Sequence, residues 1–214
     1  MPAPRSRPSS PSATSSASDT RSSGVRTRRV TSVVRARGAH LLWCTHRYGV
    51  RMISMDRALH HMAWANARVY EAVATLPDAA LDAYIVNPEW TARRILEHIV
   101  SGATWYVHCL GIERWQEVPA PATMADVPAL AARLAGFDAQ IRTAVAADDA
   151  VLEFEDEGGT GRMLRSTLLV QAVHHATEHR AQLIDALESR DHRCIALDDV
   201  DLWAFDAWER AAGA

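Results

Sequence analysis

Hydrophobic residues recur every three or four positions in several long stretches of the chain, which is the spacing of helices that bury one face. In the first stretch Leu59, Met62, Val69 and Val73 lie on one such face, and Asn66 is its polar exception. The stretches predicted as long helices cover approximately residues 55–76, 91–110, 125–147 and 163–189. Long amphipathic helices joined by short loops predict an all-α fold, a four-helix bundle.

Residues that begin and end helices support these boundaries. Ser54 and Thr91 are good N-caps for the first two helices, because their hydroxyl groups can accept hydrogen bonds from free backbone N–H groups. Pro77 and Gly111 follow the ends of the same helices. Asp198 and Asp199 can cap a short extra C-terminal helix at about residues 200–211.

The connection between the third and fourth helices has a different pattern. Val151–Glu155 alternates weakly between apolar and polar residues, and Gly158–Gly161 is rich in turn-forming glycine. We therefore expect a short strand or a β-like excursion there. The acidic residues of this stretch are expected to be solvated, with Ca²⁺ binding as the alternative.

The first 51 residues differ in composition from the remainder. They are rich in Ser, Arg and Pro, and contain ten Arg but only one acidic residue, Asp19. Such a segment cannot bury a core, so residues 1–51 are predicted to be a disordered basic extension and residues 52–214 the helical domain. The composition is similar to that of a transit peptide, but Arg35 and Arg37 interrupt the only apolar stretch that could serve a secretion signal. A start codon assigned too far upstream, with Met52 or Met55 as the native start, is the alternative.

Charge and cysteine content narrow the class of protein. Residues 52–214 contain thirteen Arg and 25 acidic residues, so no sequence-specific nucleic-acid binding is expected from this domain. No apolar run approaches the ~18 residues of a membrane span. Three scattered cysteines, Cys44, Cys109 and Cys194, indicate a reducing, cytoplasmic location more than a disulfide framework.

Two histidines carry the most informative chemistry. His175 and His179 are four residues apart, so they share a helix face and can bind one metal ion. His98, beside the apolar face of the second helix, is the best candidate for a third ligand. The spacing alone is weak evidence, because histidines on helices are more often solvated or hydrogen-bonded. Glu178 directly precedes His179, which excludes the usual HExxH metalloprotease arrangement.

An ordered set of segments resembles the DinB-like (DinB/YfiT-like) family of metal-dependent enzymes. The segment Gln171–Gln182 resembles the HxxxHRxQ motif of that family. Trp64–Arg68, Trp90–Ile99 and Asp198–Trp208 resemble its other characteristic segments, in the expected order. No single motif is specific, but the ordered set is, and it extends over about residues 52–210.

The resemblance implies a four-helix bundle, often a homodimer, with one divalent metal ion (Zn, Ni, Mn or Fe) held by His98, His175 and His179. Glu178 and Ala181 replace residues that are often His and Gly in the family, and neither change removes a ligand. Gln171 stands where many members have a further His, which argues against a fourth protein ligand.

The resemblance also implies a reaction class, because characterised relatives include thiol-dependent S-transferases. The expected function is metal-dependent transfer in which a low-molecular-weight thiol attacks a small electrophile. A metal-dependent hydrolase, a non-catalytic metal- or ligand-binding bundle and a purely structural bundle are the alternatives. Arg93 and Arg180 are candidates for holding an anionic substrate or for surface ion pairs. Asn66 is expected near the site or as a core amide, and Trp105 is expected to face the metal cavity.

Overall fold

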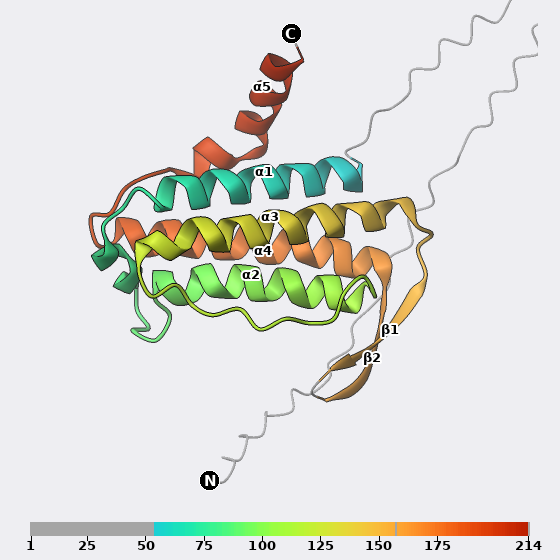
Figure 1. The fold of residues 1–214 in the computed structure, drawn as a ribbon. Coiled ribbons are helices and arrows are strands. Elements are labelled where there is room, and N and C mark those ends of the chain that lie inside the picture. Colours follow the sequence, from blue (N-terminus) through green and yellow to red (C-terminus); the bar gives the residue numbers. More distant parts are fainter. Residues whose placement is uncertain (1–53, 157, 214) are drawn as a thin grey trace, which may run out of the picture. The chain divides into compact units, whose positions relative to one another are not determined.

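The computed structural model describes residues 54–156 and 158–213, so the predicted basic extension at residues 1–51 lies outside the described part. The four-helix bundle is confirmed, and Figure 1 shows its long helices running side by side. The helices of the bundle are α1 (Met55–Val73), α2 (Ala92–Cys109), α3 (Val127–Thr143) and α4 (Arg165–Glu188). Helices α1 and α2 each pack against both α3 and α4, which encloses one core.

The predicted N-caps are confirmed, whereas some helix ends were predicted too far out. The backbone N–H groups of Arg57 and Arg94 donate to the hydroxyl oxygens of Ser54 and Thr91 at 3.1 and 3.4 Å. Gly111 follows α2 with a positive φ of 72°, as expected of a residue after a helix end. Beyond α1 the chain turns into a 3₁₀ helix at Asp78–Asp82, and 3₁₀ turns at Met124–Asp126 and Ala144–Ala146 flank α3.

A β-hairpin connects α3 to α4 and corrects the predicted start of the fourth helix. Strands β1 (Val151–Asp156) and β2 (Gly159–Leu164) pair antiparallel, and Met163 lies opposite Leu152 instead of beginning α4. Gly161 was predicted in a turn, but it lies in β2 under the ring of Phe154. A Cβ atom on Gly161 would approach that ring to 2.5 Å, so the glycine lets the buried aromatic ring pack against the strand.

The short C-terminal helix α5 (Leu202–Ala212) is confirmed, with a different cap from the one predicted. Asp201 caps it by accepting from the backbone N–H of Ala204 at 2.8 Å, while Asp198 and Asp199 lie in a preceding 3₁₀ turn. Phe205 is completely buried. Figure 1 shows α5 projecting from the α1 side of the bundle.

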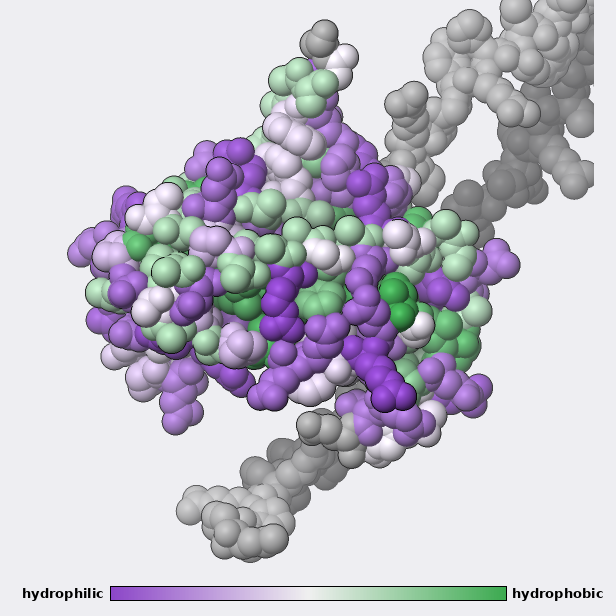
Figure 2. Space-filling model, viewed as in Figure 1, coloured by the Kyte–Doolittle hydropathy of each residue, from purple (hydrophilic) through white to green (hydrophobic). Residues whose placement is uncertain are grey.

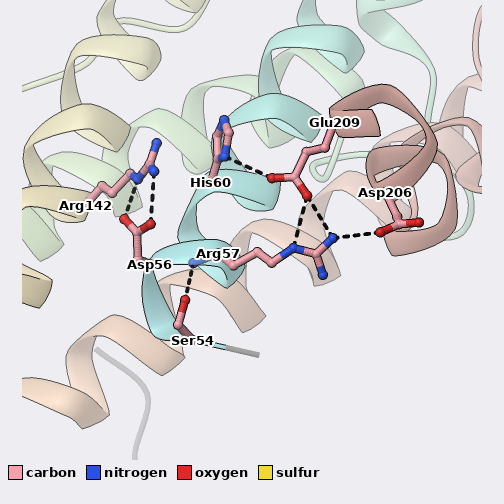
Figure 3. Close-up of polar contacts among 7 residues, drawn as sticks. All are labelled: Ser54, Asp56, Arg57, His60, Arg142, Asp206 and Glu209. Carbon is pink, nitrogen blue, oxygen red and sulfur yellow. Dashed lines mark hydrogen bonds and ion pairs between the residues drawn. The ribbon is translucent and has the colours of Figure 1, made fainter. Parts of the chain in front are cut away.

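Ion pairs join α5 to the first turns of α1 around this buried ring. The guanidinium group of Arg57 contacts the carboxylates of Asp206 and Glu209 at 3.1 and 2.8 Å, as Figure 3 shows. On its other side, α1 is tied to α3 by the two hydrogen bonds that Arg142 donates to Asp56. Both α5 and α3 are therefore fixed to the same end of α1.

Three further properties of the helical domain are the polarity of its surface, the hydropathy of its helices and the state of its cysteines. Figure 2 shows hydrophilic side chains interspersed with hydrophobic ones over one face of the bundle. None of the helices in the described ranges is long and apolar enough to cross a membrane. Cys109 and Cys194 are both free thiols, and burial raises the pKa of Cys109 to about 12, which suits a small buried hydrophobe more than a nucleophile.

Candidate metal centre

His98 on α2 and His175 and His179 on α4 converge where these two helices pack together. One ring nitrogen from each lies within 4.8 Å of one ring nitrogen of the other two, and all three side chains are half-buried. The ring centroids are 4.4 to 4.9 Å apart. The two histidines on α4 and the best candidate on α2 therefore come together as the sequence predicted.

The geometry of the cluster fits a metal ion. The Nε2 atoms of His175 and His98 are 3.1 Å apart. Two nitrogens bound to one tetrahedral Zn²⁺ at roughly 2.0–2.1 Å would lie about 3.3 Å apart, so a small shift of either ring admits the ion. Histidine nitrogens suit Zn²⁺, Ni²⁺ and Fe²⁺ better than Mg²⁺ or Ca²⁺, which prefer oxygen.

A glutamine fixes the orientation of the third imidazole. The side-chain carbonyl oxygen of Gln182 lies 2.9 Å from Nδ1 of His179 and accepts a 2.9 Å hydrogen bond from the indole N–H of Trp90. A carbonyl oxygen can only accept, so Nδ1 of His179 carries the proton and Nε2 is left with a free lone pair. Nε2 of His179 can therefore serve as a ligand, and Gln182 lies where the outer hydrogen-bond partner of a metal-bound histidine would be.

Trp90 also closes one side of the cluster. Its ring makes T-shaped contacts with His98 and His179, at centroid distances of 5.1 and 5.6 Å. Neither this position of Trp90 nor the role of Gln182 was predicted from the sequence. The sequence signal that could have identified Trp90 and Gln182 is that both lie in segments that resemble the family.

A glycine makes room for His175. A Cβ atom on Gly102 would lie 2.2 Å from Cε1 of His175, far inside van der Waals contact. The imidazole therefore lies directly against the backbone of α2. Gly102 is four residues after His98 on the same helix face. Because this glycine has no side chain, the ring of His175 can lie over it and contact His98.

Burial keeps two of the imidazoles neutral. Burial, together with the neighbouring His179 and His98, lowers the pKa of His175 to about 3. Burial and the charge of His179 also lower the pKa of His98. Neutral imidazole is the form that binds metal. At neutral pH these two imidazoles are therefore already in that form and need not be deprotonated first.

The other helical histidines lie elsewhere. His60 and His61 contact Phe205 and belong to the junction with α5. Nε2 of His108 donates to the carbonyl oxygen of Glu155 in the hairpin at 3.0 Å. His174 is exposed on α4, and its position next to His175 turns it away from the cluster.

Arg180 corrects one expectation, since it holds neither a substrate nor a surface partner. It is only 3 % exposed, and its guanidinium donates to the Asn66 side-chain oxygen at 2.6 Å. Asn66 in turn donates to the carboxylate of Asp138 on α3 at 2.8 Å. This buried Arg180–Asn66–Asp138 network confirms the alternative in which Asn66 is a satisfied core amide, and it ties α4 to α1 and α3.

The two remaining candidates also lie away from the metal ligands. Arg93 donates to the carbonyl oxygens of Pro121 and Ala122 and pairs with Asp82, so it fastens the loop before α3. Trp105 contacts Tyr106 and Phe154, and it is Tyr106 whose ring reaches His175, at 5.8 Å. Trp105 is therefore one ring away from the cluster.

Comparisons with known proteins agree with the fold. The sequence model of the DinB family matches residues 52–199. The fold is similar to that of a DinB-like protein from Bacillus cereus, with a TM-score of 0.54 at 15% sequence identity, covering 67% of this chain and 95% of that one. No curated protein matches the chain significantly. The structural likeness, at this identity, concerns the fold alone.

Proposed function

Because the chain belongs to the DinB family, and because His98, His175 and His179 converge in one cluster, we propose that it is a metal-dependent transferase. Its substrates would be a low-molecular-weight thiol and a small electrophile. The convergence of three imidazoles is the single observation that carries this proposal. The resemblance to a family whose characterised relatives include thiol-dependent S-transferases supports the choice of thiol chemistry over hydrolysis.

Three protein ligands suit a catalytic ion better than a structural one, because structural zinc sites usually have four. A divalent ion held by neutral imidazoles keeps its full charge, and when bound it would stabilise the thiolate form of a coordinated thiol. The thiolate sulfur would then form a bond to the electrophilic carbon, and the leaving group would depart with its electron pair. The thiol proton would pass to solvent.

Residues around the ligands have separate tasks in this proposal. Gln182 holds the lone pair of His179 Nε2 toward the ion through its contact with Nδ1. Trp90 shields the His98 and His179 side from water. Arg94 pairs with Glu97, but its guanidinium is exposed and its charge acts on His98, which makes it a better candidate than the buried Arg180 for meeting an anionic substrate.

Metal content of purified full-length protein tests the first half of the proposal. The wild type should bind one equivalent of Zn²⁺ or Ni²⁺ with submicromolar affinity in a competitive chelator titration, and His175→Ala should lose this affinity by 100-fold or more. His174→Ala is the matched control, because it removes the neighbouring, exposed imidazole. Equal binding by wild type and His175→Ala would contradict the site.

Turnover of an activated alkyl or aryl halide with a panel of small thiols tests the second half. The proposal expects product only when both metal and thiol are present. Metal-dependent cleavage of an ester or amide without thiol would instead indicate the hydrolase, and stoichiometric metal without any turnover would indicate the binding protein.

A further inference from the structure

A small cavity inside the bundle borders both the metal centre and the buried network. It is lined by residues from all four long helices, and its polar members are Asn66, Tyr106, Asp138 and His175. The room that it leaves for the centres of water molecules is about 10 Å³. One buried water needs roughly 10–15 Å³ by this measure, together with two to four polar partners. The cavity therefore suits a single water molecule.

The imidazole of His175 has one ring nitrogen on each side of its contact with Gly102. Its Cε1 atom lies against the backbone at Gly102, and its Nε2 atom lies on the His98 side, 3.1 Å from Nε2 of that residue. Nδ1 is therefore on the opposite side of Cε1. His98, Gly102 and Tyr106 follow one another at intervals of four residues along one face of α2. Nδ1 thus lies toward Tyr106, which lines the cavity and whose ring is 5.8 Å from that of His175.

Nδ1 of His175 needs a hydrogen-bond acceptor once Nε2 binds a metal ion. The proton of a neutral imidazole is then on Nδ1, and this outer N–H almost always donates to a carboxylate, a carbonyl group or water. His179 has Gln182 for this purpose. In residues 54–156 and 158–213, no protein group forms a hydrogen bond with Nδ1 of His175. A half-buried donor without an acceptor costs free energy, and a water molecule in the cavity would remove that cost.

Asp138 supplies the acceptor on the other side of the cavity. It is 2% exposed, and its Oδ2 atom accepts from Asn66 at 2.8 Å. Within the described ranges no protein group donates to its other oxygen, Oδ1. Its pKa of about 6 leaves the carboxylate as the prevailing form at pH 7.5, so Oδ1 can accept. A second cavity of similar size also borders Asp138, but residues of α1 and α3 alone line it, so it reaches no metal ligand.

We propose that one ordered water molecule in this cavity joins the metal centre to the buried network. Nδ1–H of His175 donates to the water, and the water donates to Oδ1 of Asp138. Asp138 is thus a positioning residue, which holds the ring and the tautomer of His175 for metal binding without touching the metal. It does for His175 what Gln182 does for His179. The inference rests on the metal-binding half of the proposed function and is independent of the thiol chemistry.

A crystal structure of the full-length protein loaded with Zn²⁺ tests the bridge directly. We expect a water molecule within hydrogen-bonding distance of both Nδ1 of His175 and Oδ1 of Asp138. An empty cavity, or a water that contacts only one of these two atoms, would overturn the inference. In ¹⁵N spectra of the same Zn²⁺-loaded protein, His175 and His179 should both show an Nδ1–H group.

Asp138→Asn separates positioning from a purely structural role, because its amide oxygen still accepts from Asn66. Zn²⁺ affinity should fall by about 3- to 10-fold, which is less than the roughly 10- to 100-fold expected for a direct outer partner. The Nδ1–H signal of His175 should shift, while that of His179, whose acceptor is Gln182, should not. Affinity and His175 signal both equal to those of the wild type would contradict the role of Asp138.

Tyr106→Phe is the matched control in the same cavity. It keeps the ring that contacts His175 and removes only a hydroxyl group. Zn²⁺ affinity and the His175 signal should therefore stay as in the wild type. A larger effect of Tyr106→Phe than of Asp138→Asn would make the hydroxyl group the partner of the water and overturn the assignment to Asp138.

Failure of this inference can be told apart from failure of the proposed function. A Zn²⁺ site that contains the bridging water and responds to Asp138→Asn, in a protein without thiol-dependent turnover, would support the bridge and leave the transferase as the failed part. A Zn²⁺ site without the water would defeat the bridge alone. A wild-type protein that binds no Zn²⁺ or Ni²⁺ would defeat both.

Discussion

The imidazole of His175 occupies the space that a side chain on Gly102 would need, with Cε1 only 2.2 Å from the ideal Cβ position. This contact joins the two helices that provide the ligands. In Gly102→Ala, the ring must rotate away from His98 or the helices must separate. We expect metal affinity to fall at least 10-fold in a chelator titration, although alanine by itself favours a helix over glycine by about 1 kcal/mol.

Gly136 in α3 offers the control for this substitution. A Cβ atom there would meet nothing within 4 Å. Gly136→Ala should stabilise the domain by about 0.5–1 kcal/mol in urea denaturation and leave metal affinity unchanged. If Gly102→Ala binds metal as tightly as Gly136→Ala does, the contact has no bearing on the site.

Gln182 is expected to set the orientation of His179. Gln182→Leu keeps the side chain's approximate size but removes the acceptor for Nδ1, so metal affinity should fall by about 10- to 100-fold. Gln182→Glu keeps an acceptor oxygen and should recover most of the affinity. Imidazole ¹⁵N chemical shifts, measured without metal, should show a defined Nδ1–H tautomer of His179 in the wild type and a mixture in the leucine variant. The same tautomer in both would contradict the assignment.

The carboxyl group of Asp138 is expected to make stability depend on pH. Burial raises its pKa to about 6, although the hydrogen bond from Asn66 and the charge of Arg180 oppose this. The folded state therefore holds a proton that the unfolded state loses between about pH 4 and pH 6. The contribution of this group to stability is complete below pH 4 and is lost as the pH rises through 6.

Asp138→Asn isolates this contribution. The free energy of unfolding of the wild type minus that of the variant should decrease from pH 4 to pH 7, by up to about 3 kcal/mol for a shift of this size. The amide oxygen of the variant can still accept from Asn66, so the network keeps its geometry. Urea denaturation of metal-free protein gives the measurement, and a difference that stays constant with pH would exclude the raised pKa.

Attachment of α5 is expected to depend on one aromatic ring more than on the ion pairs shown in Figure 3. Phe205 is completely buried against α1, so Phe205→Ala should cost about 3–5 kcal/mol or release α5, seen as rapid amide hydrogen exchange in residues 202–212. Arg57→Ala should have a much smaller effect, because Asp206 and Glu209 remain partly open to solvent. Trp203→Ala, on the exposed face of α5, should leave exchange unchanged.

Much of the fold and the cluster of His98, His175 and His179 could be predicted from local sequence signals. Periodicity located the four helices, and Ser54 and Thr91 marked two of their starts because capping needs only the neighbouring backbone. The pair on α4 followed from helix geometry, and His98 from its place beside an apolar face. These inferences need no knowledge of how distant segments meet.

What failed depends on contacts between distant segments. Arg180 was expected at the surface because isolated arginines rarely lose their water, but Asn66 and Asp138, more than 40 residues earlier in the chain, supply its buried partners. Met163 reads as the first residue of a helix, yet pairing with β1 draws it into a strand. The sequence gives no sign of what Gly102 accommodates, and only the assembled bundle shows that it is the ring of His175.

His179 and Arg180 are consecutive on α4 and face in different directions, one into the metal centre and the other into the buried network with α1 and α3. The rotation of α4 about its own axis is therefore fixed within one helical turn by two sets of contacts, the histidine cluster on one side and the buried network on the other. A substitution in the core that turns this helix slightly would misalign a ligand far from the altered residue. Metal affinity should therefore respond to changes in core packing. A variant can lose metal although none of the three histidines was substituted.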